Sequence, residues 1–311
     1  MTTPWCEKYR PTKFTNIVLE SQTRTIFKNI LNSGRFPHLL LYGPPGAGKT
    51  TSAENIIREY QQTHYRINRE TIMHLNASDE RGIEVIRTQI YQYVQSNNMF
   101  EKGYKFVILD EVDYMTKNAQ QALKNLIQSC NANVRFCLIC NYICKLDESL
   151  KNEFICIRFN HLPSDEIVKF ISHIAESEKI TIKKETINTI QDMFHNDIRS
   201  MVNFIQLNHT DPNWETTLFN NELWENIHTL FKSKNEKEIN SFIQKITTES
   251  SNLDINTCIK KYFHHMIIHH NKYITSSFLN ICETIIHSNT RVYELSYFIY
   301  HIIEEYKKID K

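Results

Sequence analysis

The chain contains the stretch Gly43-Pro44-Pro45-Gly46-Ala47-Gly48-Lys49-Thr50-Thr51, which follows the apolar run Leu39-Leu40-Leu41-Tyr42. The apolar run is typical of a buried strand, and the spacing G-x-x-x-x-G-K-T is that of a nucleotide-phosphate loop. The glycines let successive backbone N–H groups point at one spot, and the helix expected near Lys49 adds its positive dipole end. We therefore predict that residues 43–51 hold a triphosphate. Lys49 should reach the β and γ phosphates, and Thr50 should hold Mg²⁺.

A second apolar run, Phe106-Val107-Ile108-Leu109, leads directly into Asp110-Glu111-Val112-Asp113. Open α/β sheets place their chemistry at the carboxyl ends of the strands, where these acidic residues should lie. Asp110 is suited to bind Mg²⁺, directly or through water, and Glu111 can act as the general base that polarises the attacking water. The two motifs together indicate an ATP-hydrolysing site.

Length and composition set the outer bounds. The chain has 311 residues, of which 41% are hydrophobic and 23% charged, with a formal net charge of +1. These values are ordinary for a globular protein of two or three domains. Because the net charge is close to zero, any binding of nucleic acid must come from a local patch or from partner subunits. No apolar stretch approaches the roughly 18 residues of a transmembrane helix, and a secretion signal is not evident. We expect a soluble protein that is not secreted.

Cysteines and histidines suggest metal sites only weakly. Cys137 and Cys140 lie in the apolar run of residues 136–140, where thiols behave as small buried hydrophobes. Gaps of three and four residues along a strand also place the side chains of Cys137, Cys140 and Cys144 too far apart to bind one metal ion. Four histidines, at positions 264, 265, 269 and 270, have helical spacing. We expect no carboxylate or cysteine set to accompany them, so a partly exposed helix face is the better interpretation.

The pattern of residues changes along the chain. All six glycines precede residue 104, and the strand-like runs, which include residues 73–75, 106–109, 136–140 and 155–159, end by residue 159. Helical patterns follow, interrupted by a linker-like stretch at residues 208–213. We predict three domains: a nucleotide-binding α/β domain at residues 1–159, a helical lid at 160–208 and a helical oligomerisation domain at 209–311.

Several separate stretches resemble the small subunits of replication factor C, the sliding-clamp loader of eukaryotes and archaea and a member of the AAA+ ATPases. The matching stretches, in order, are Pro4-Trp5-Cys6-Glu7-Lys8-Tyr9-Arg10-Pro11, residues 36–46, residues 75–83, residues 119–123, Cys140-Asn141-Tyr142 and Asn196-Asp197-Ile198-Arg199. The likeness covers roughly residues 4–207, and beyond that only length and helical character agree. It implies an α/β P-loop AAA+ ATPase core with a helical lid, followed by an all-α C-terminal collar domain.

The resemblance also assigns roles to single residues. The segment Glu7 to Pro11 wraps the adenine, and Tyr9 and Pro11 offer apolar faces to the base while Arg10 lies between them. Asn141, at the end of the strand beside the one that carries Asp110, is the polar sensor of the γ phosphate. Arg199 resembles the second sensor, which reaches from the lid onto the nucleotide. We count Glu111, Lys49, Asn141 and Arg199 as the catalytic set. Asn76 resembles the residue that restrains the catalytic glutamate until DNA binds.

A smaller set is expected to contact DNA. Arg81 and Arg87 flank the start of a predicted helix, where N–H groups and basic side chains together grip phosphate, and Lys145 lies just past the sensor asparagine. In the family, the corresponding positions line the inner surface of a subunit spiral that tracks the DNA backbone. Solvated surface charges are the alternative interpretation.

Two departures from the family pattern affect communication between subunits. Where the small subunits carry a Ser-Arg-Cys triplet, whose arginine completes the neighbour's ATP site, this chain has Asn152-Glu153-Phe154. A carboxylate at that point would repel a γ phosphate. The usual pair of arginines after Gln121-Ala122-Leu123 is replaced by Lys124-Asn125.

The sequence thus predicts an ATP-binding and hydrolysing small subunit of a replication clamp loader, with ATP and Mg²⁺ as ligands. Its implied partners are the other subunits of a hetero-oligomeric ring of five, a sliding clamp and primer-template DNA, with no membrane. It should act in the nucleus or at a site of DNA replication in the cytoplasm. The alternatives are an AAA+ subunit of a checkpoint or recombination complex, and a nucleotide-binding scaffold that never hydrolyses ATP.

Overall fold

The computed structural model describes most of the chain in two compact units, Met1–Glu215 and Thr216–Lys311. The described residues are 3–65, 68–78, 86–96, 103–160, 162–210, 214, 221–233, 238–239, 241, 255–287 and 292–309. The predicted boundaries at residues 159 and 208 lie inside the first unit and stay predictions.

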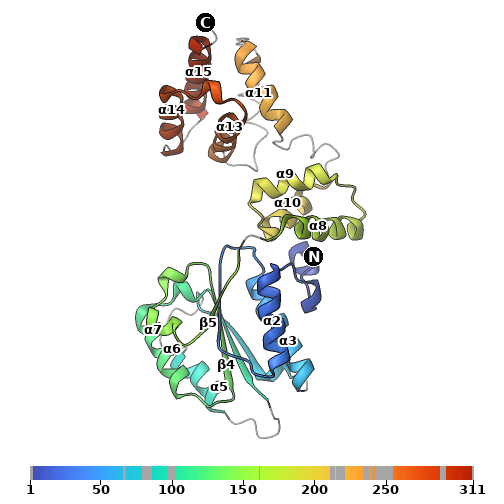
Figure 1. Ribbon diagram of the computed structural model, residues 1–311, viewed down its shortest axis with the longest axis vertical. Coiled ribbons are helices and arrows are strands. Elements are labelled where there is room, and N and C mark those ends of the chain that lie inside the picture. The colour runs from blue at the N-terminus through green and yellow to red at the C-terminus, as the bar shows by residue number, and fades with distance from the viewer. Residues whose placement is uncertain are drawn as a thin grey trace. The chain divides into compact units, whose positions relative to one another are not determined.

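A five-stranded parallel sheet forms the centre of the first unit (Figure 1). Its strands are β1 (Leu39–Tyr42), β2 (Ile72–Asn76), β3 (Lys105–Asp110), β4 (Val134–Cys140) and β5 (Ile155–Arg158). Their spatial order is β2-β3-β4-β1-β5. The strands confirm the predicted apolar runs, with ends shifted by one or two residues. Because every pairing is parallel, the carboxyl ends of β1, β3 and β4 lie at one edge of the sheet.

Helices cover both faces of this sheet, which explains why its strands read as continuous apolar runs (Figure 1). Helices α2 (Ser21–Ser33) and α3 (Lys49–His64) lie on one face, and α5 (Tyr91–Gln95), α6 (Lys117–Ser129) and α7 (Glu148–Lys151) lie on the other. Successive strand residues point to opposite faces. Leu39 and Leu41 share a buried cluster with Ile56 of α3, whereas Leu40 shares one with Leu123 of α6. The predicted α/β class is confirmed.

Three further helices follow the last strand, and the N-terminal segment contacts them. They are α8 (Ser164–Glu178), α9 (Lys184–Phe194) and α10 (Ile198–Asn208). In α1 (Trp5–Lys8), the backbone N–H of Trp5 donates to Oε1 of Gln206 at 2.8 Å, and the Trp5 ring lies 4.8 Å from the ring of His209. Residues from both ends of the first unit therefore border the same region.

Short helical segments connect the longer elements of the first unit. They are η1 (Phe14–Asn16), η2 (Arg69–Thr71), η3 (Ile86–Ile90), η4 (Val112–Tyr114) and η5 (Ile143–Lys145).

The second unit is helical throughout its described residues. Its elements are α11 (Asn221–Ser233), α13 (Ile255–His269), η7 (Asn271–Tyr273), α14 (Ser276–His287) and α15 (Val292–Ile309). Aromatic side chains fill its core, and the hydroxyl groups of Tyr262 and Tyr306 form a buried hydrogen bond of 2.9 Å. The predicted helical character of the C-terminal region is confirmed. Among the described helices of both units, none is long and apolar enough to cross a membrane.

Candidate nucleotide site

The phosphate loop joins the end of β1 to the first turn of α3. Gly48 is the N-cap of α3 and has φ of 80°, a left-handed backbone that glycine adopts without strain. Gly46 has φ of 69°, and a Cβ atom there would lie 1.8 Å from Oδ1 of Asp197. The sequence therefore needs glycine at these points for two reasons, backbone conformation and close approach. The loop leaves the N–H groups of the first turn of α3 free to meet an anion.

Lys49 is held at the centre of the loop by three oxygen atoms. Its Nζ donates to the carbonyl oxygens of Gly43 and Pro44, each at 2.8 Å, and to Oδ1 of Asn141 at 2.9 Å. The residue is only 7% exposed, and burial lowers the pKa of Lys49 although the Asp110 carboxylate opposes that shift. The ammonium is thus desolvated and positioned, and a phosphate oxygen could replace the carbonyl partners.

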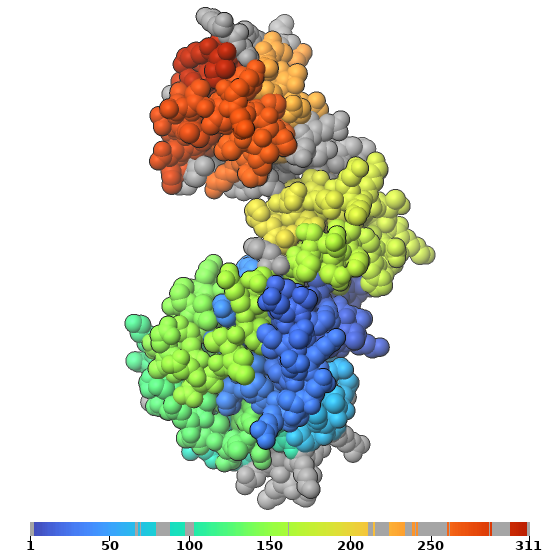
Figure 2. Space-filling model, in the orientation of Figure 1, coloured from blue at the N-terminus to red at the C-terminus, as the bar shows by residue number. Residues whose placement is uncertain are grey.

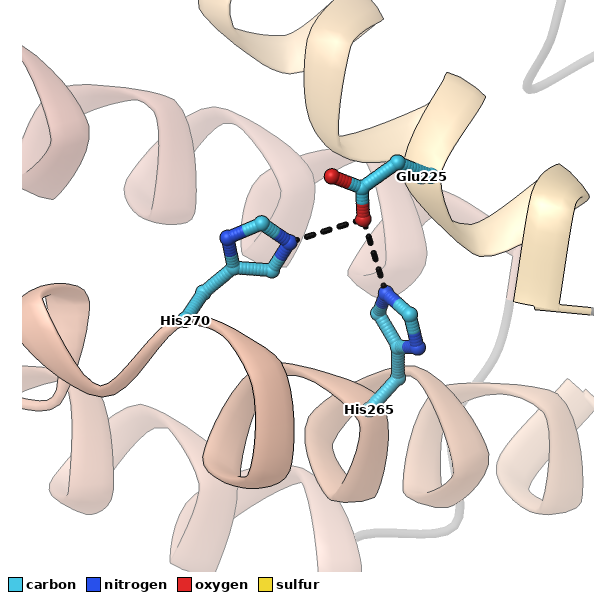
Figure 3. A group of neighbouring side chains, drawn as sticks. All are labelled: Glu225, His265 and His270. Atoms are coloured by element: carbon cyan, nitrogen blue, oxygen red, sulfur yellow. Dashed lines mark hydrogen bonds and ion pairs between the residues drawn. The ribbon is translucent and has the colours of Figure 1, made fainter.

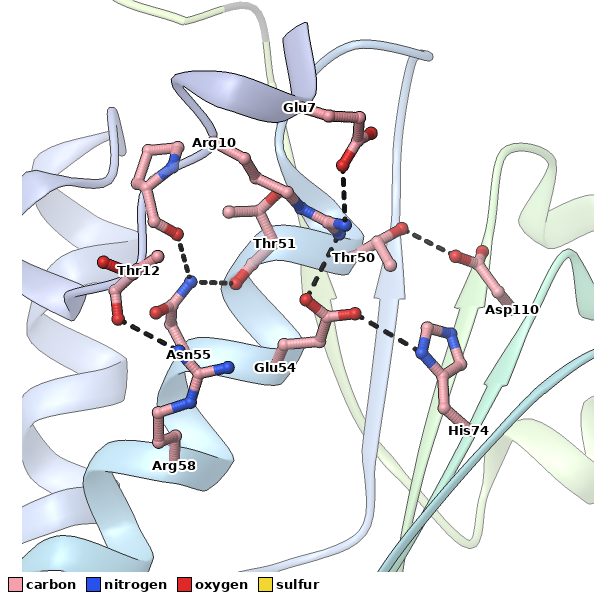
Figure 4. A network of polar contacts seen from close by, with 11 residues as sticks. Glu7, Arg10, Thr12, Thr50, Thr51, Glu54, Asn55, Arg58, His74 and Asp110 are labelled. Carbon is pink, nitrogen blue, oxygen red and sulfur yellow. Dashed lines mark hydrogen bonds and ion pairs between the residues drawn. The ribbon is translucent and has the colours of Figure 1, made fainter. Parts of the chain in front are cut away.

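Thr50 and Asp110 meet across the site from two elements. Thr50 lies in the first turn of α3 and Asp110 ends β3, and the threonine hydroxyl donates to Oδ2 of Asp110 at 2.6 Å (Figure 4). Hydroxyl and carboxylate oxygens are the hard ligands that Mg²⁺ prefers. The pair that sequence reasoning assigned to the metal is therefore brought together, and its chemistry fits that ion.

Glu111 follows Asp110 in a strained backbone conformation. Its φ is 56°, in the left-handed region that non-glycine residues rarely occupy, and its N–H donates to Oδ1 of Asp110 at 2.8 Å. Such strain is concentrated at functional sites because the surrounding structure must maintain it. Asn76, beside Asp110 in the sheet register, accepts a 2.9 Å hydrogen bond from the Ser78 N–H at its Oδ1.

These residues line a single cavity of about 470 Å³. The lining includes the predicted residues Glu7, Arg10, Pro11, Pro45, Gly46, Gly48, Lys49, Thr50, Thr51, Asp110, Glu111, Asn141 and Arg199. Apolar side chains of α8 and α10, Phe170, Ile174 and Val202, border it as well. An apolar wall beside a phosphate loop offers space for a nucleoside, so the cavity suits a nucleoside triphosphate.

A polar network fixes the N-terminal segment beside α3, and sequence reasoning missed most of it (Figure 4). Nε of Arg10 donates to Oγ1 of Thr51 at 3.1 Å, and the guanidinium lies 3.3 Å from Glu54 and 3.6 Å from Glu7. Glu54 also pairs with Nδ1 of His74 at 3.3 Å. Burial disfavours ionisation of Glu54, but the His74 hydrogen bond and the charge of Arg10 outweigh it and lower the pKa of Glu54.

Farther down α3, Asn55 and Arg58 extend the attachment of the N-terminal segment. Nδ2 of Asn55 donates to the carbonyl oxygens of Pro11 and Thr51, each at 2.8 Å, and Arg58 donates to the Thr12 carbonyl at 3.2 Å (Figure 4). Glu54 lies four residues after Thr50, which places both residues on one face of α3. This spacing is the signal that could have identified Glu54 from the sequence. His74 carries no such signal.

Some predicted nucleotide-site residues lie outside the cavity lining. The hydroxyl of Tyr9 donates to Oε1 of Glu178 at 2.6 Å, so Tyr9 contacts α8 and is not among the lining residues. Gly43, Pro44 and Ala47 form the loop without lining the cavity, and Ala47 is buried. The structure thus gives no contact between these four residues and the cavity.

The predicted DNA residues are described only in part. Arg81 and the side chain of Arg87 lie outside the described residues. Lys145 is exposed at the end of η5, and its Nζ lies 5.1 Å from the ring centroids of both Tyr114 and Tyr142. The two tyrosines are themselves 48% and 57% exposed. This arrangement keeps a cation and two aromatic rings on the surface near Asn141.

The histidines of the second unit contradict the expectation that no carboxylate accompanies them. Glu225 of α11 lies within hydrogen-bond distance of His265 and His270 (Figure 3). Helical spacing identifies neighbours on one helix only, whereas Glu225 comes from a helix about 40 residues earlier in the chain. His264 and His269 are exposed as predicted, but His265 is only 6% exposed. The predicted burial of Cys137 and Cys140 is confirmed, and burial raises the pKa of Cys140 to about 12.

Several known proteins are similar in sequence to this chain. Residues 39–161 match the family described as "ATPase family associated with various cellular activities (AAA)". Replication factor C small subunit 2 of Pyrobaculum islandicum is 39% identical over 203 residues, which are 65% of this chain and 62% of that protein. Replication factor C subunit 3 of Schizosaccharomyces pombe is 38% identical over 67% of this chain and 60% of its own length. Human replication factor C subunit 5 is 37% identical over 65% of this chain and 59% of its own length.

The match therefore spans less than two thirds of these relatives' length. A solved structure of a variant of RuvB from Thermotoga maritima has a TM-score of 0.55 at 15% identity, covering 96% of this chain and 90% of that one. At that identity the likeness speaks for the fold alone. The chain carries an AAA domain at residues 39–161, and about two thirds of the chain are similar in sequence to subunits of replication factor C.

Proposed function

We propose that this chain is an ATP-binding and hydrolysing small subunit of a DNA-replication clamp loader, which opens a sliding clamp and places it on primer-template DNA. The observation that carries the proposal is the convergence of Lys49, Thr50, Asp110, Glu111 and Asn141 on one cavity. All five lie within residues 39–161, which match the AAA family. Each of these residues has a distinct task in phosphoryl transfer.

ATP enters with its phosphates over the first turn of α3. The ammonium of Lys49 then exchanges the carbonyl oxygens of Gly43 and Pro44 for phosphate oxygens, which are stronger partners because they are charged. Thr50 and Asp110 would hold Mg²⁺, which when bound would stabilise the negative charge of the transferring phosphoryl group. The hydrogen bond between Asn141 and Lys49 supports the role of Asn141 as the sensor of the γ phosphate.

Glu111 acts as the general base in this proposal. A carboxylate at the cavity wall accepts a proton from the attacking water while the water bonds to the γ phosphorus and the bond to the leaving oxygen breaks. Arg199, in the first turn of α10, also lines the cavity and adds positive charge to it. ATP binding therefore draws α10 toward the phosphate loop, and product release reverses the movement.

The remaining parts of the proposal concern partners. The helices of the second unit join this chain to related subunits in a ring of five. Arg81, Arg87 and Lys145 contact the DNA backbone, which requires only positive charge and no base reading. Action in the nucleus, or at a replication site in the cytoplasm, follows from this role.

Glu153 limits what the chain can offer a neighbouring ATP site. Its Oε1 accepts a 2.7 Å hydrogen bond from Nε2 of Gln128, and Lys151 on the same segment is paired with Glu148 at 2.6 Å. An arginine finger is worth on the order of 10³ or more in rate. The chain should therefore accept a finger from one neighbour without donating one to the other, and alone it should bind ATP with little turnover.

The test uses the complex isolated through a tag on this chain. Lys49→Ala should weaken ATP binding at this chain's site, whereas Glu111→Gln should retain binding and stop hydrolysis there. The exposed Glu185→Gln on α9 is the matched control and should leave both unchanged. ATP bound to this chain is followed by photo-crosslinking, and its hydrolysis in a single turnover with clamp and primer-template DNA.

Continued hydrolysis at this site by Glu111→Gln would show that the base is assigned wrongly. An ATPase that responds to neither the clamp nor primer-template DNA would instead favour a different AAA+ role.

A further inference from the structure

Three side chains in the second unit converge on one point, outside the nucleotide site (Figure 3). Oε2 of Glu225 lies 3.1 Å from Nε2 of His265 and 2.8 Å from Nε2 of His270. All three potential ligand atoms lie within 4.8 Å of one another. They come from α11, from α13 and from the residue that follows α13.

The surroundings hold these side chains in place. His265 is buried, the His270 side chain is 17% exposed and the Glu225 side chain is 53% exposed. The His228 ring, one helical turn after Glu225, stacks on the His270 ring with centroids 4.0 Å apart and planes 28° apart. One side of the cluster is therefore packed, and the side at Glu225 faces solvent.

We propose that Glu225, His265 and His270 form a binding site for a zinc ion, which links α11 to the end of α13. Two imidazole nitrogens and one carboxylate oxygen make a donor set well suited to Zn²⁺, and Mg²⁺ and Ca²⁺ prefer all-oxygen sites. With three protein ligands, the solvent-facing side leaves the fourth position to water.

To accept the ion, the three ligand atoms, which lie within 4.8 Å of one another, must become nearly equidistant. Zinc bonds of about 2.0–2.2 Å in a tetrahedral arrangement place neighbouring ligand atoms roughly 3.4 Å apart. The observed contacts of 2.8 and 3.1 Å are slightly shorter, as expected when protons occupy the place of the metal. Zinc would bind the Nε2 lone pair of each neutral imidazole, so the ring proton would move from Nε2 to Nδ1 through solvent, and side-chain rotations would convert the hydrogen-bonded trio into a coordination site.

The competing explanation is a purely structural ion pair, in which both imidazoles donate to one carboxylate oxygen and no metal binds. The two explanations differ in an observable. A zinc site has a stoichiometry, an affinity that depends on all three side chains, and a preference for Zn²⁺ over Mg²⁺. A structural ion pair has none of these.

The experiment is equilibrium dialysis of the full chain with Zn²⁺, after treatment with a chelator and in buffer containing excess Mg²⁺. One zinc ion per chain should bind. Loss of a residue that only supports a metal ligand costs 10–100-fold in affinity, so Glu225→Gln or His270→Ala, which removes a ligand, should cost at least about 10-fold. The control is His264→Ala, an exposed histidine on α13, which should bind zinc like the parent chain.

Co²⁺ gives a second readout that is independent of stability. The parent chain with Co²⁺ should show the visible absorption of a low-coordinate site with nitrogen and oxygen ligands, and Glu225→Gln should lose it. Circular dichroism of each variant without metal establishes that it is folded. The proposal is overturned if the parent chain binds no zinc, or if folded Glu225→Gln and His270→Ala bind zinc as tightly as His264→Ala.

Discussion

Replacing Thr50 by valine should separate two roles of its hydroxyl group. In the structure that hydroxyl donates a 2.6 Å hydrogen bond to Oδ2 of Asp110, and the pair is partly buried. In the proposed ATP complex the same two side chains hold Mg²⁺. A hydrogen bond to a charged group contributes about 1.5–3 kcal/mol, and partial exposure reduces that value. Thr50→Val should therefore lower the free energy of unfolding of the Mg²⁺-free chain by about 1–2 kcal/mol.

The effect on ATP should depend on the metal. Without Mg²⁺, ATP affinity should change little because Lys49 and the loop N–H groups remain. With Mg²⁺, the gain in affinity that the metal provides should fall about 10-fold, equivalent to about 1.4 kcal/mol. Unfolding is measured with urea in the presence of a chelator, and ATP affinity is measured by calorimetry with and without Mg²⁺.

The exposed Thr63→Val on the same helix is the matched control and should change neither quantity. A double-mutant cycle with Asp110→Asn isolates the pair, since the two residues are in direct contact. The assignment of Thr50 to the metal is refuted if Thr50→Val weakens ATP binding equally with and without Mg²⁺. A coupling energy near zero in the Mg²⁺-free chain would refute the hydrogen-bond argument.

Three further predictions concern the first unit. Gly46→Ala should abolish ATP binding, measured by calorimetry, because its Cβ would lie 1.8 Å from Asp197 Oδ1 at a φ of 69°. Arg10→Ala should weaken ATP binding, by about 10-fold if one charged hydrogen-bond partner is lost, while urea unfolding shows a folded chain. Burial beside Arg135 lowers the pKa of His38 to about 4, and His38 Nδ1 accepts the N–H of Phe136. As the pH falls below 6.5, His38 is protonated in the unfolded chain before it is protonated in the folded chain. The free energy of unfolding therefore decreases between pH 6.5 and pH 4, by at most about 3 kcal/mol. Urea unfolding of His38→Gln across that range should show a shallower loss; an unchanged slope would contradict it.

The sheet and the central site residues could be predicted because their signals are local. Parallel strands covered on both faces must be apolar throughout, so each run was visible without its neighbours. Once β1, β3 and β4 are known to be parallel, Lys49, Asp110 and Asn141 must meet at one edge. The phosphate loop fixes which edge. Pairing of Thr50 with Asp110 then follows from topology alone.

Residues that depend on packing between distant elements could not be found this way. Glu225 meets His265 only because α11 packs beside α13, and helical periodicity says nothing about which helices pack together. Tyr9 was expected to face a base, but the hydroxyl binds Glu178 at the end of α8. A preference for burial or for a ring contact is weaker than a specific hydrogen bond to a charged partner. Sequence patterns do not reveal such partners.

The network around Arg10 connects the N-terminal segment to the first turns of α3. The sequence indicates a segment for the base and a loop for the phosphates as separate features. In the structure, Arg10 contacts Thr51 in the first turn of α3 and Glu54 one turn later. Because α3 carries both contacts, we expect a displacement of its first turn by bound phosphates to be transmitted to the N-terminal segment. That segment in turn contacts α10 through Trp5. We therefore expect phosphate binding to be coupled to movement of the helices after β5 through these contacts, and Arg10→Ala should weaken the coupling as well as the affinity.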